Sequence, residues 1–136
     1  MERLYQTYRD IAEFRMVYIR EAHAADSKWS VDYAHEKKIF EHTTFAERCS
    51  SAKALVDDKS LTIPCIVDDM ENTANLAYSG WPDRIFVVRT DGTLAVAAAE
   101  GPFGFVPALE ETEAWLQRFR VDGSEEPLVA GDAAGE

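Results

Sequence analysis

The chain has 136 residues, 46% of them hydrophobic, and a formal net charge of −11. This length can bury the core of one domain, and the hydrophobic content is typical of a globular protein rather than a disordered one. The acidic balance argues against a surface that neutralises nucleic-acid phosphates. No apolar run reaches membrane-spanning length, and the N-terminus lacks the basic and apolar pattern of a signal peptide, so we expect no membrane contact.

Two cysteines, Cys49 and Cys65, show neither CxxC nor zinc-site spacing. A disulfide scaffold is therefore not expected, and the pattern fits a reducing, cytoplasmic location. The three histidines, His23, His35 and His42, lack HExxH or Cys/His spacing, so the sequence predicts no metal site.

Two elements are predicted near the N-terminus. Apolar residues recur at helical spacing and predict an amphipathic helix over Glu2–Glu13. Phe14–Ile19 contains only one polar residue and predicts a strand covered on both faces. This strand ends abruptly in the polar residues Arg20, Glu21 and His23.

The next segment, Asp26–Phe40, is polar and irregular and predicts a loop with at most a short helical turn. Thr44 and Glu47 have the spacing of a capping box, in which each side chain binds the other residue's backbone amide. They predict a helix that runs to about Asp57. Its predicted apolar face consists of Phe45, Cys49, Ala52 and Val56.

Ile63–Val67 predicts a short strand at a sheet edge, because Pro64 cannot donate a ladder hydrogen bond. Glu71–Tyr78 predicts a short helix that ends at Ser79 and Gly80. The β-rich runs Arg84–Arg89 and Thr93–Ala99 flank Asp91-Gly92, a strong hairpin signal, and predict an antiparallel pair.

Gly101–Phe105 predicts a tight loop, and Leu109–Phe119 predicts a last helix with Trp115 and Leu116 facing inward. From Val121 the chain holds five acidic residues and no Lys or Arg, so residues 1–120 alone carry −6. We therefore expect one folded domain over residues 1–120 and an acidic disordered tail over residues 121–136.

The predicted order is helix, strand, helix, strand, helix, hairpin, helix, which describes an α/β protein with a mixed sheet and flanking helices. It is also the order of a thioredoxin-like fold with one extra strand–helix unit. In open α/β sheets, ligands gather beyond the carboxyl ends of strands, which makes Glu21 and His23 candidate site residues. A strand that simply turns polar on reaching water would give the same pattern.

Five ordered segments resemble one known family. They are Val17–His23 with Asp26 and Trp29, Glu41-His42 with Glu47–Ala52, Val67–Tyr78, Trp81–Val88, and Gly101–Phe105. The matching family patterns are Y-I-E-E-A-H, E-D-R-C-A-A, V-D-x-M-x-N-x-A-N-x-A-Y, P-E-R-L-Y-V-I and G-P-W/F-x-Y. The chain thus resembles the iodothyronine deiodinase family, including its bacterial relatives.

Members of that family are thioredoxin-like oxidoreductases that remove iodine reductively from an aromatic ring. They use a cysteine or selenocysteine nucleophile and a thiol reductant as co-substrate. The resemblance implies catalytic roles for Glu21 and His23 beside the nucleophile, and for His42 as a proton relay. It implies no cofactor, and a small molecule and a thiol reductant as partners.

The resemblance also implies that Arg84 binds the substrate, with Trp81 and Pro82 beside it and Pro82 as the cis-proline of the fold. Arg20 stands where the family usually has a Glu, and this charge reversal bears on substrate preference. Cys49 and Cys65 are candidate redox thiols, although a buried structural role is the commoner one for such residues.

The family's nucleophile motif, G-S-x-T-C/U-P-P-F, is absent from this sequence. In a thioredoxin-like fold its strand is central, between Phe14–Arg20 and Arg84–Arg89. We therefore expect an incomplete gene model; the alternatives are another chain's strand in that place or direct pairing of the two neighbours. The alternative function is a non-catalytic thioredoxin-like domain that binds a ligand or forms a homodimer through its incomplete sheet.

Overall fold

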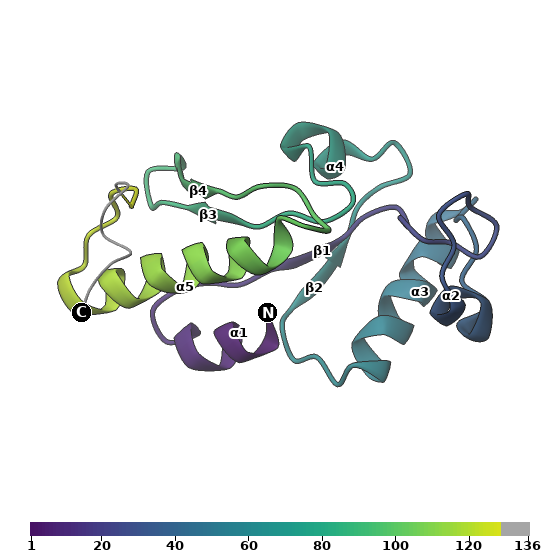
Figure 1. The fold of residues 1–136 in the computed structure, drawn as a ribbon, viewed down its shortest axis with the longest axis horizontal. Helices are drawn as coiled ribbons and strands as arrows, with labels where there is room; N and C mark the ends of the chain where they lie inside the picture. Colours follow the sequence, from purple (N-terminus) through teal and green to yellow (C-terminus); the bar gives the residue numbers. More distant parts are fainter. Residues whose placement is uncertain (129–136) are drawn as a thin grey trace. The chain divides into compact units, whose positions relative to one another are not determined.

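The computed structural model describes residues 1–128 (Figure 1). The helices and strands in chain order are α1 (Glu2–Tyr8), β1 (Met16–Tyr18), α2 (Asp32–Lys37), α3 (Phe45–Asp58), β2 (Cys65–Val67), α4 (Thr73–Tyr78), β3 (Phe86–Val88), β4 (Leu94–Ala97) and α5 (Phe105–Asp122). The chain forms two compact units. One holds Met1, Arg3–Ala12 and the chain from Asp83 on, and the other holds Glu2 and Glu13–Pro82.

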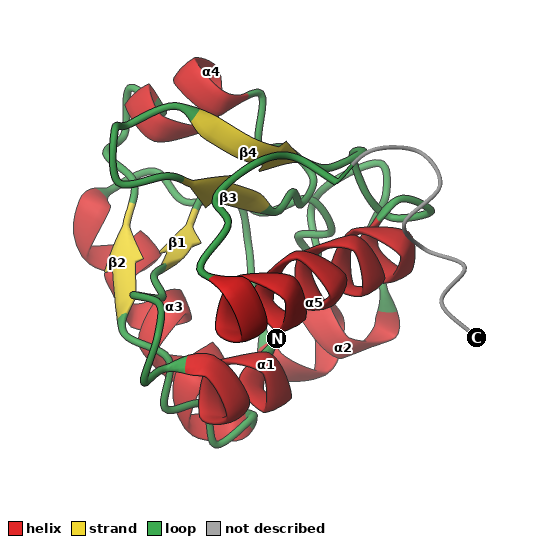
Figure 2. Ribbon diagram, turned by 90° about the vertical axis from the view of Figure 1, so that its left-hand side faces the viewer, coloured by secondary structure: helices red, strands yellow, loops and turns green. Residues whose placement is uncertain are grey.

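The unit that begins at Asp83 is built on an antiparallel hairpin of β3 and β4, as predicted. Gly92 has a φ of +86° in the turn, a left-handed conformation that glycine adopts without steric cost. Figures 1 and 2 show α5 running alongside this hairpin, with α1 on the other side of α5. Buried residues of this unit include Leu4, Tyr8, Ile85, Val96, Ala98, Ala108, Trp115 and Leu116.

Helix α5 is longer than the predicted Leu109–Phe119 at both ends. Pro107 is its third residue, where a missing N–H costs nothing because the first-turn amides have no intrahelical partner. The segment after the helix contacts the fold: Glu125 accepts from the Thr90 amide at 3.0 Å, and the Glu126 carbonyl accepts from the Trp115 indole at 3.0 Å. The tail predicted to be disordered from residue 121 therefore begins with helical residues and with residues that are hydrogen-bonded to the fold. Residues 129–136 of that tail lie outside the described residues.

The Glu13–Pro82 unit is built on β1 and β2, which pair in parallel with Val17 opposite Ile66. Val17 is 40% exposed and Ile66 51%, so the prediction that the first strand is covered on both faces is wrong. The strand is also shorter than the apolar run, because only three residues form the ladder with β2. The Pro64 carbonyl accepts from the Met16 amide at 2.9 Å, which places Pro64 at the start of the pairing, as expected.

Helices α3 and α2 follow local signals to different degrees. The predicted capping box of α3 is confirmed, with the Thr44 hydroxyl accepting from the Glu47 amide and the Glu47 carboxylate accepting from the Thr44 amide. Its buried face differs from the prediction, because Phe45 is 50% exposed whereas Arg48 is only 3% exposed. The polar segment predicted as a loop with a helical turn contains α2, a six-residue helix.

Helices α1 and α4 are both shorter than predicted. After Tyr8 the chain leaves the helix in a turn in which the Ile11 and Ala12 amides both donate to the Tyr8 carbonyl. Helix α4 begins at Thr73, and its first turn is held by the buried carboxylate of Asp68, at the end of β2. No helix among the described residues has both the length and the apolar character needed to cross a membrane.

Candidate functional site

The carboxyl end of β1 carries a cluster of polar side chains. Tyr18, the last strand residue, is 8% exposed, and its hydroxyl donates to Glu21 Oε1. Glu21 is half-buried, and burial raises the pKa of its carboxyl, while the nearby His23 opposes that rise. A carboxyl whose pKa is raised keeps its proton to a higher pH than an ordinary carboxyl, which is the direction of change that favours a general acid.

His42 lies next to the Tyr18 ring. The ring centroids of Tyr18 and His42 are 6.0 Å apart and tilted by 47°. Both His42 nitrogens are buried, and among the described residues neither has a hydrogen-bond partner. Burial lowers the pKa of His42, and the positive charge of Arg48 lowers it further, against an opposing effect of Glu47, so the neutral imidazole is favoured to a lower pH than in an ordinary histidine. A buried polar ring without a partner is costly in a native structure and marks a candidate ligand contact.

We expect this burial to make stability depend on pH. The ordinary pKa of His42 is 6.5 and the folded value is lower, so the unfolded chain takes up the proton first as pH falls. Stability contributed by His42 is therefore lost from about pH 6.5 downward. His42→Phe should remove that loss. The free energy of unfolding of His42→Phe in urea, relative to that of the wild type, should therefore rise from pH 7 to pH 5.

His35→Gln is the matched control, because His35 is an exposed histidine on α2. Its unfolding free energy should follow that of the wild type across the same pH range. Parallel curves for His42→Phe and wild type would contradict a buried neutral His42.

His23 is more exposed than Glu21. Its Nδ1 lies 2.7 Å from the Trp29 carbonyl, a contact that fixes the ring and is best made by an Nδ1–H donor. That tautomer leaves Nε2 as the proton acceptor of the ring. His23 and Glu21 thus lie close enough for their charges to interact, as the effect of His23 on the Glu21 pKa indicates.

Arg20 and Trp81 lie together in the same unit. The Arg20 guanidinium is 5.1 Å from the centre of the Trp81 ring, within the range of a cation–π contact. The indole N–H of Trp81 is buried and has no hydrogen-bond partner among the described residues. The Trp81–Pro82 bond is cis, as the resemblance predicts for Pro82.

Arg84 belongs to the other compact unit, the one that begins at Asp83. Its Nε donates to the Ala98 carbonyl at 2.7 Å, and its Nη1 lies 3.6 Å from a Glu100 carboxylate oxygen. The guanidinium also lies 5.2 Å from the centre of the Phe86 ring. These contacts hold the Arg84 side chain at the start of the β3 hairpin, and its predicted substrate role stays a prediction.

Both cysteines are free thiols of intermediate burial. Burial raises the pKa of the Cys65 thiol, which lowers the thiolate fraction at neutral pH and makes it a poor nucleophile. Cys49 lies on α3 and Cys65 begins β2. No group of three or more His, Cys, Asp or Glu residues suited to a metal ion occurs in residues 1–128.

The structure therefore brings together Glu21, His23 and His42 of the predicted site residues. Sequence reasoning missed Tyr18, which contacts Glu21 and His42, although its place as the inward-facing last residue of a strand was a usable signal. It also missed Arg48, because a buried arginine on the apolar face of a helix goes against the usual pattern.

The chain is similar to members of one known protein family. The family model described as iodothyronine deiodinase matches residues 1–120. The chain is 31% identical over 122 residues to thyroxine 5-deiodinase of Sparus aurata, covering 88% of this chain and 42% of the relative. It is 31% identical over 120 residues to type II iodothyronine deiodinase of Homo sapiens, covering 85% and 42%.

A type I iodothyronine deiodinase of Xenopus laevis is 32% identical over 106 residues, covering 77% of this chain and 40% of that protein. The chain thus spans about two fifths of the length of these relatives. The mixed α/β architecture, with small sheets and flanking helices, is compatible with a thioredoxin-like fold. The chain belongs to the iodothyronine deiodinase family.

Proposed function

We propose that the chain is the proton-handling and substrate-binding part of a thiol-dependent reductive dehalogenase. The reaction is Ar–I + 2 RSH → Ar–H + RS–SR + HI, in which the aryl carbon is reduced and two thiols are oxidised to a disulfide. The aryl carbon must gain a proton as the carbon–iodine bond breaks. The observation that carries the proposal is the contact of Tyr18 with both Glu21 and His42 at the carboxyl end of β1.

Each member of that cluster has a distinct part in the proposal. Glu21, whose pKa is raised by burial, supplies the proton that replaces iodine. Tyr18 holds the Glu21 carboxyl by its hydroxyl donation, and the neutral His42 accepts and returns protons next to the Tyr18 ring. His23, with Nδ1 fixed on the Trp29 carbonyl, presents Nε2 to the substrate.

Because the chain belongs to the iodothyronine deiodinase family, the proposal gives substrate-binding roles to Arg84, Trp81 and Pro82. A guanidinium suits a carboxylate or a phenolate, both of which occur on iodinated tyrosine derivatives. The thiol RSH is a co-substrate rather than a bound cofactor, so the proposal includes a reducing, cytoplasmic setting. A bacterial source and a homodimer stay predictions.

The test is an assay of the protein with thyroxine, the substrate that gives the relative thyroxine 5-deiodinase its name. Iodide release is measured with dithiothreitol as the thiol. Thyroxine binding is measured independently by quenching of tryptophan fluorescence, for which Trp29 and Trp81 lie in contact with His23 and Arg20. We expect saturable quenching and iodide release that requires the thiol.

Saturable binding without iodide release would favour the non-catalytic alternative, a thioredoxin-like domain that binds ligands or dimerises. Absence of both binding and release would reject the proposed function.

A further inference from the structure

A pocket of about 510 Å³ lies between α2 and α3, in the Glu13–Pro82 unit. Tyr33, Lys37 and Lys38 line it from α2, and residues of α3 form the opposite wall. None of the site residues described above lines this pocket, so the inference below does not depend on the proposed function. Its volume is that of a site for a small organic ligand.

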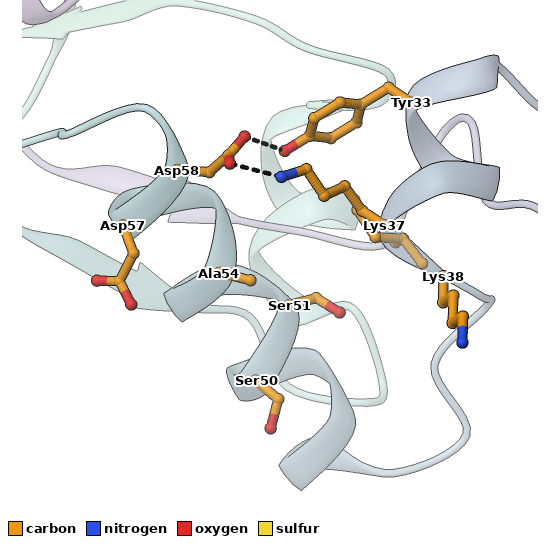
Figure 3. A pocket seen from close by; sticks show the side chains of 9 residues that line it. Tyr33, Lys37, Lys38, Ser50, Ser51, Ala54, Asp57 and Asp58 are labelled. Atoms are coloured by element: carbon orange, nitrogen blue, oxygen red, sulfur yellow. Dashed lines mark hydrogen bonds and ion pairs between the residues drawn. The ribbon is translucent and has the colours of Figure 1, made fainter.

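One end of the pocket is occupied by paired charges. Asp58 accepts from the Tyr33 hydroxyl at 2.8 Å and from Lys37 Nζ at 2.7 Å, one donor on each carboxylate oxygen. Figure 3 shows both side chains reaching across from α2 to Asp58. The hydrogen bond from Lys37 lowers the pKa of Asp58, and the same bond raises the pKa of Lys37. This end is therefore charge-balanced.

The other lining carboxylate is balanced from outside the pocket. Asp57 pairs with Lys53 Nζ at 2.5 Å, one helical turn earlier on α3. Lys38 is then the lining cation without an ion-pair partner among the described residues. A further cation, Lys59, lies 5.1 Å from the centre of the Tyr33 ring. The lining holds two lysines and two carboxylates, and because Asp58 pairs with Lys37 and Asp57 pairs with Lys53, neither carboxylate pairs with Lys38.

The backbone at Lys38 adds a second observation. Lys38 ends α2 with φ +54° and ψ +44°, a left-handed conformation that glycine or asparagine adopts at less cost. A lysine held in such a conformation at a pocket is a reason to look for a role of its side chain.

The remaining lining residues supply one polar and two apolar contacts. Ser50 Oγ donates to the Ala46 carbonyl, whereas no partner for Ser51 Oγ occurs among the described residues. Ile39 and Ala54 add apolar surface. We propose that this pocket binds a small organic carboxylate, with its anionic group on Lys38 and the Ser51 hydroxyl and its apolar body against Ile39 and Ala54.

The test uses benzoate as the probe and the full chain labelled with nitrogen-15. We expect benzoate to shift the amide signals of Lys38, Ile39 and Ser51 saturably. Lys38→Gln should weaken binding about threefold, the effect of removing one exposed ion pair. Ala54→Leu should weaken binding by more than about tenfold, because the added side chain fills the pocket without changing charge.

Lys28→Gln is the matched control, because it removes the same charge from an exposed lysine that does not line the pocket. Equal weakening by Lys28→Gln and Lys38→Gln would overturn the proposal, since binding would then reflect net charge alone. Equal affinity for benzylamine or for inorganic phosphate would also overturn it, as would unchanged binding in Ala54→Leu. If Lys38→Gln fails to fold, the Ala54→Leu result decides.

Discussion

Glu21→Gln should lower thiol-dependent iodide release by about 10²–10⁴-fold, the range expected on removing a general acid. Glutamine keeps the size of the side chain and can still accept from the Tyr18 hydroxyl, but it has no carboxyl proton to give. Thyroxine binding should change little, because the substrate contacts are assigned elsewhere. The measurement is kcat as a function of pH, with thyroxine saturating and dithiothreitol in excess.

The pH profile separates a chemical role from a structural one. Activity that needs the protonated carboxyl falls as pH rises through the folded pKa of Glu21, which lies above the ordinary 4.5. The residual activity of Glu21→Gln should lack that fall. The control is Glu36→Gln, which removes an exposed carboxyl on α2. A Glu21→Gln profile of unchanged shape and height would rule out Glu21 as the proton donor.

Stability gives an independent check on Glu21. Its folded pKa is raised, so the folded state binds the proton more tightly, and stability falls as pH rises from 4.5 through the folded pKa. Glu21→Gln has no such loss and should be more stable than wild type at pH 7, with the difference shrinking toward pH 4. An activity loss caused by unfolding is excluded by the same data.

Asp68→Ala should destabilise the protein by about 3 kcal/mol, because it leaves one buried and two partly buried amides without their acceptor. Asp68 is 5% exposed. Its Oδ1 accepts from the amides of Asp69 and Ala74 at 3.1 and 2.9 Å, and its Oδ2 accepts from the Asn75 amide at 2.9 Å. One carboxylate thus holds the end of β2 and the first turn of α4 together. Urea unfolding measures the loss.

Asp69→Ala is the matched control next to it in sequence. Asp69 is exposed and accepts from the Thr73 amide and hydroxyl at 2.9 and 2.6 Å, so its loss exposes those groups to water rather than burying them unpaired. Its destabilisation should be clearly smaller than that of Asp68→Ala. Similar losses for the two variants would show that burial of the Asp68 carboxylate does not set its contribution.

Arg48 is a second buried side chain that holds the segment after β2 in place. The arginine is 3% exposed, and its Nη1 donates to the carbonyls of both Asp68 and Asp69. Helix α3 is thereby linked to the chain that leaves β2. The positive charge of the same guanidinium lowers the pKa of His42, so Arg48 also affects the proposed proton relay.

Much of the fold could be predicted because its signals are local. The capping box of Thr44 and Glu47 and the turn at Asp91 and Gly92 depend on hydrogen bonds or dihedral angles within four residues, so spacing alone reveals them. Pro64 at the start of β2 follows from its missing donor. The order of elements, and the five ordered segments, were sufficient to predict the α/β class and the family.

Tertiary structure decided what depends on burial and on contacts between distant residues. Tyr18 and His42 are 24 positions apart, and no periodicity indicates that their rings lie side by side. Lys38 and Ser51 are 13 positions apart, and no periodicity indicates that they line the same pocket. Arg48 is buried although its residue type predicts exposure, because backbone carbonyls at the end of β2 accept hydrogen bonds from its guanidinium. Residue types and spacing thus determined the elements and the family. Desolvation within the fold determined which side chains have shifted pKa values and can transfer protons.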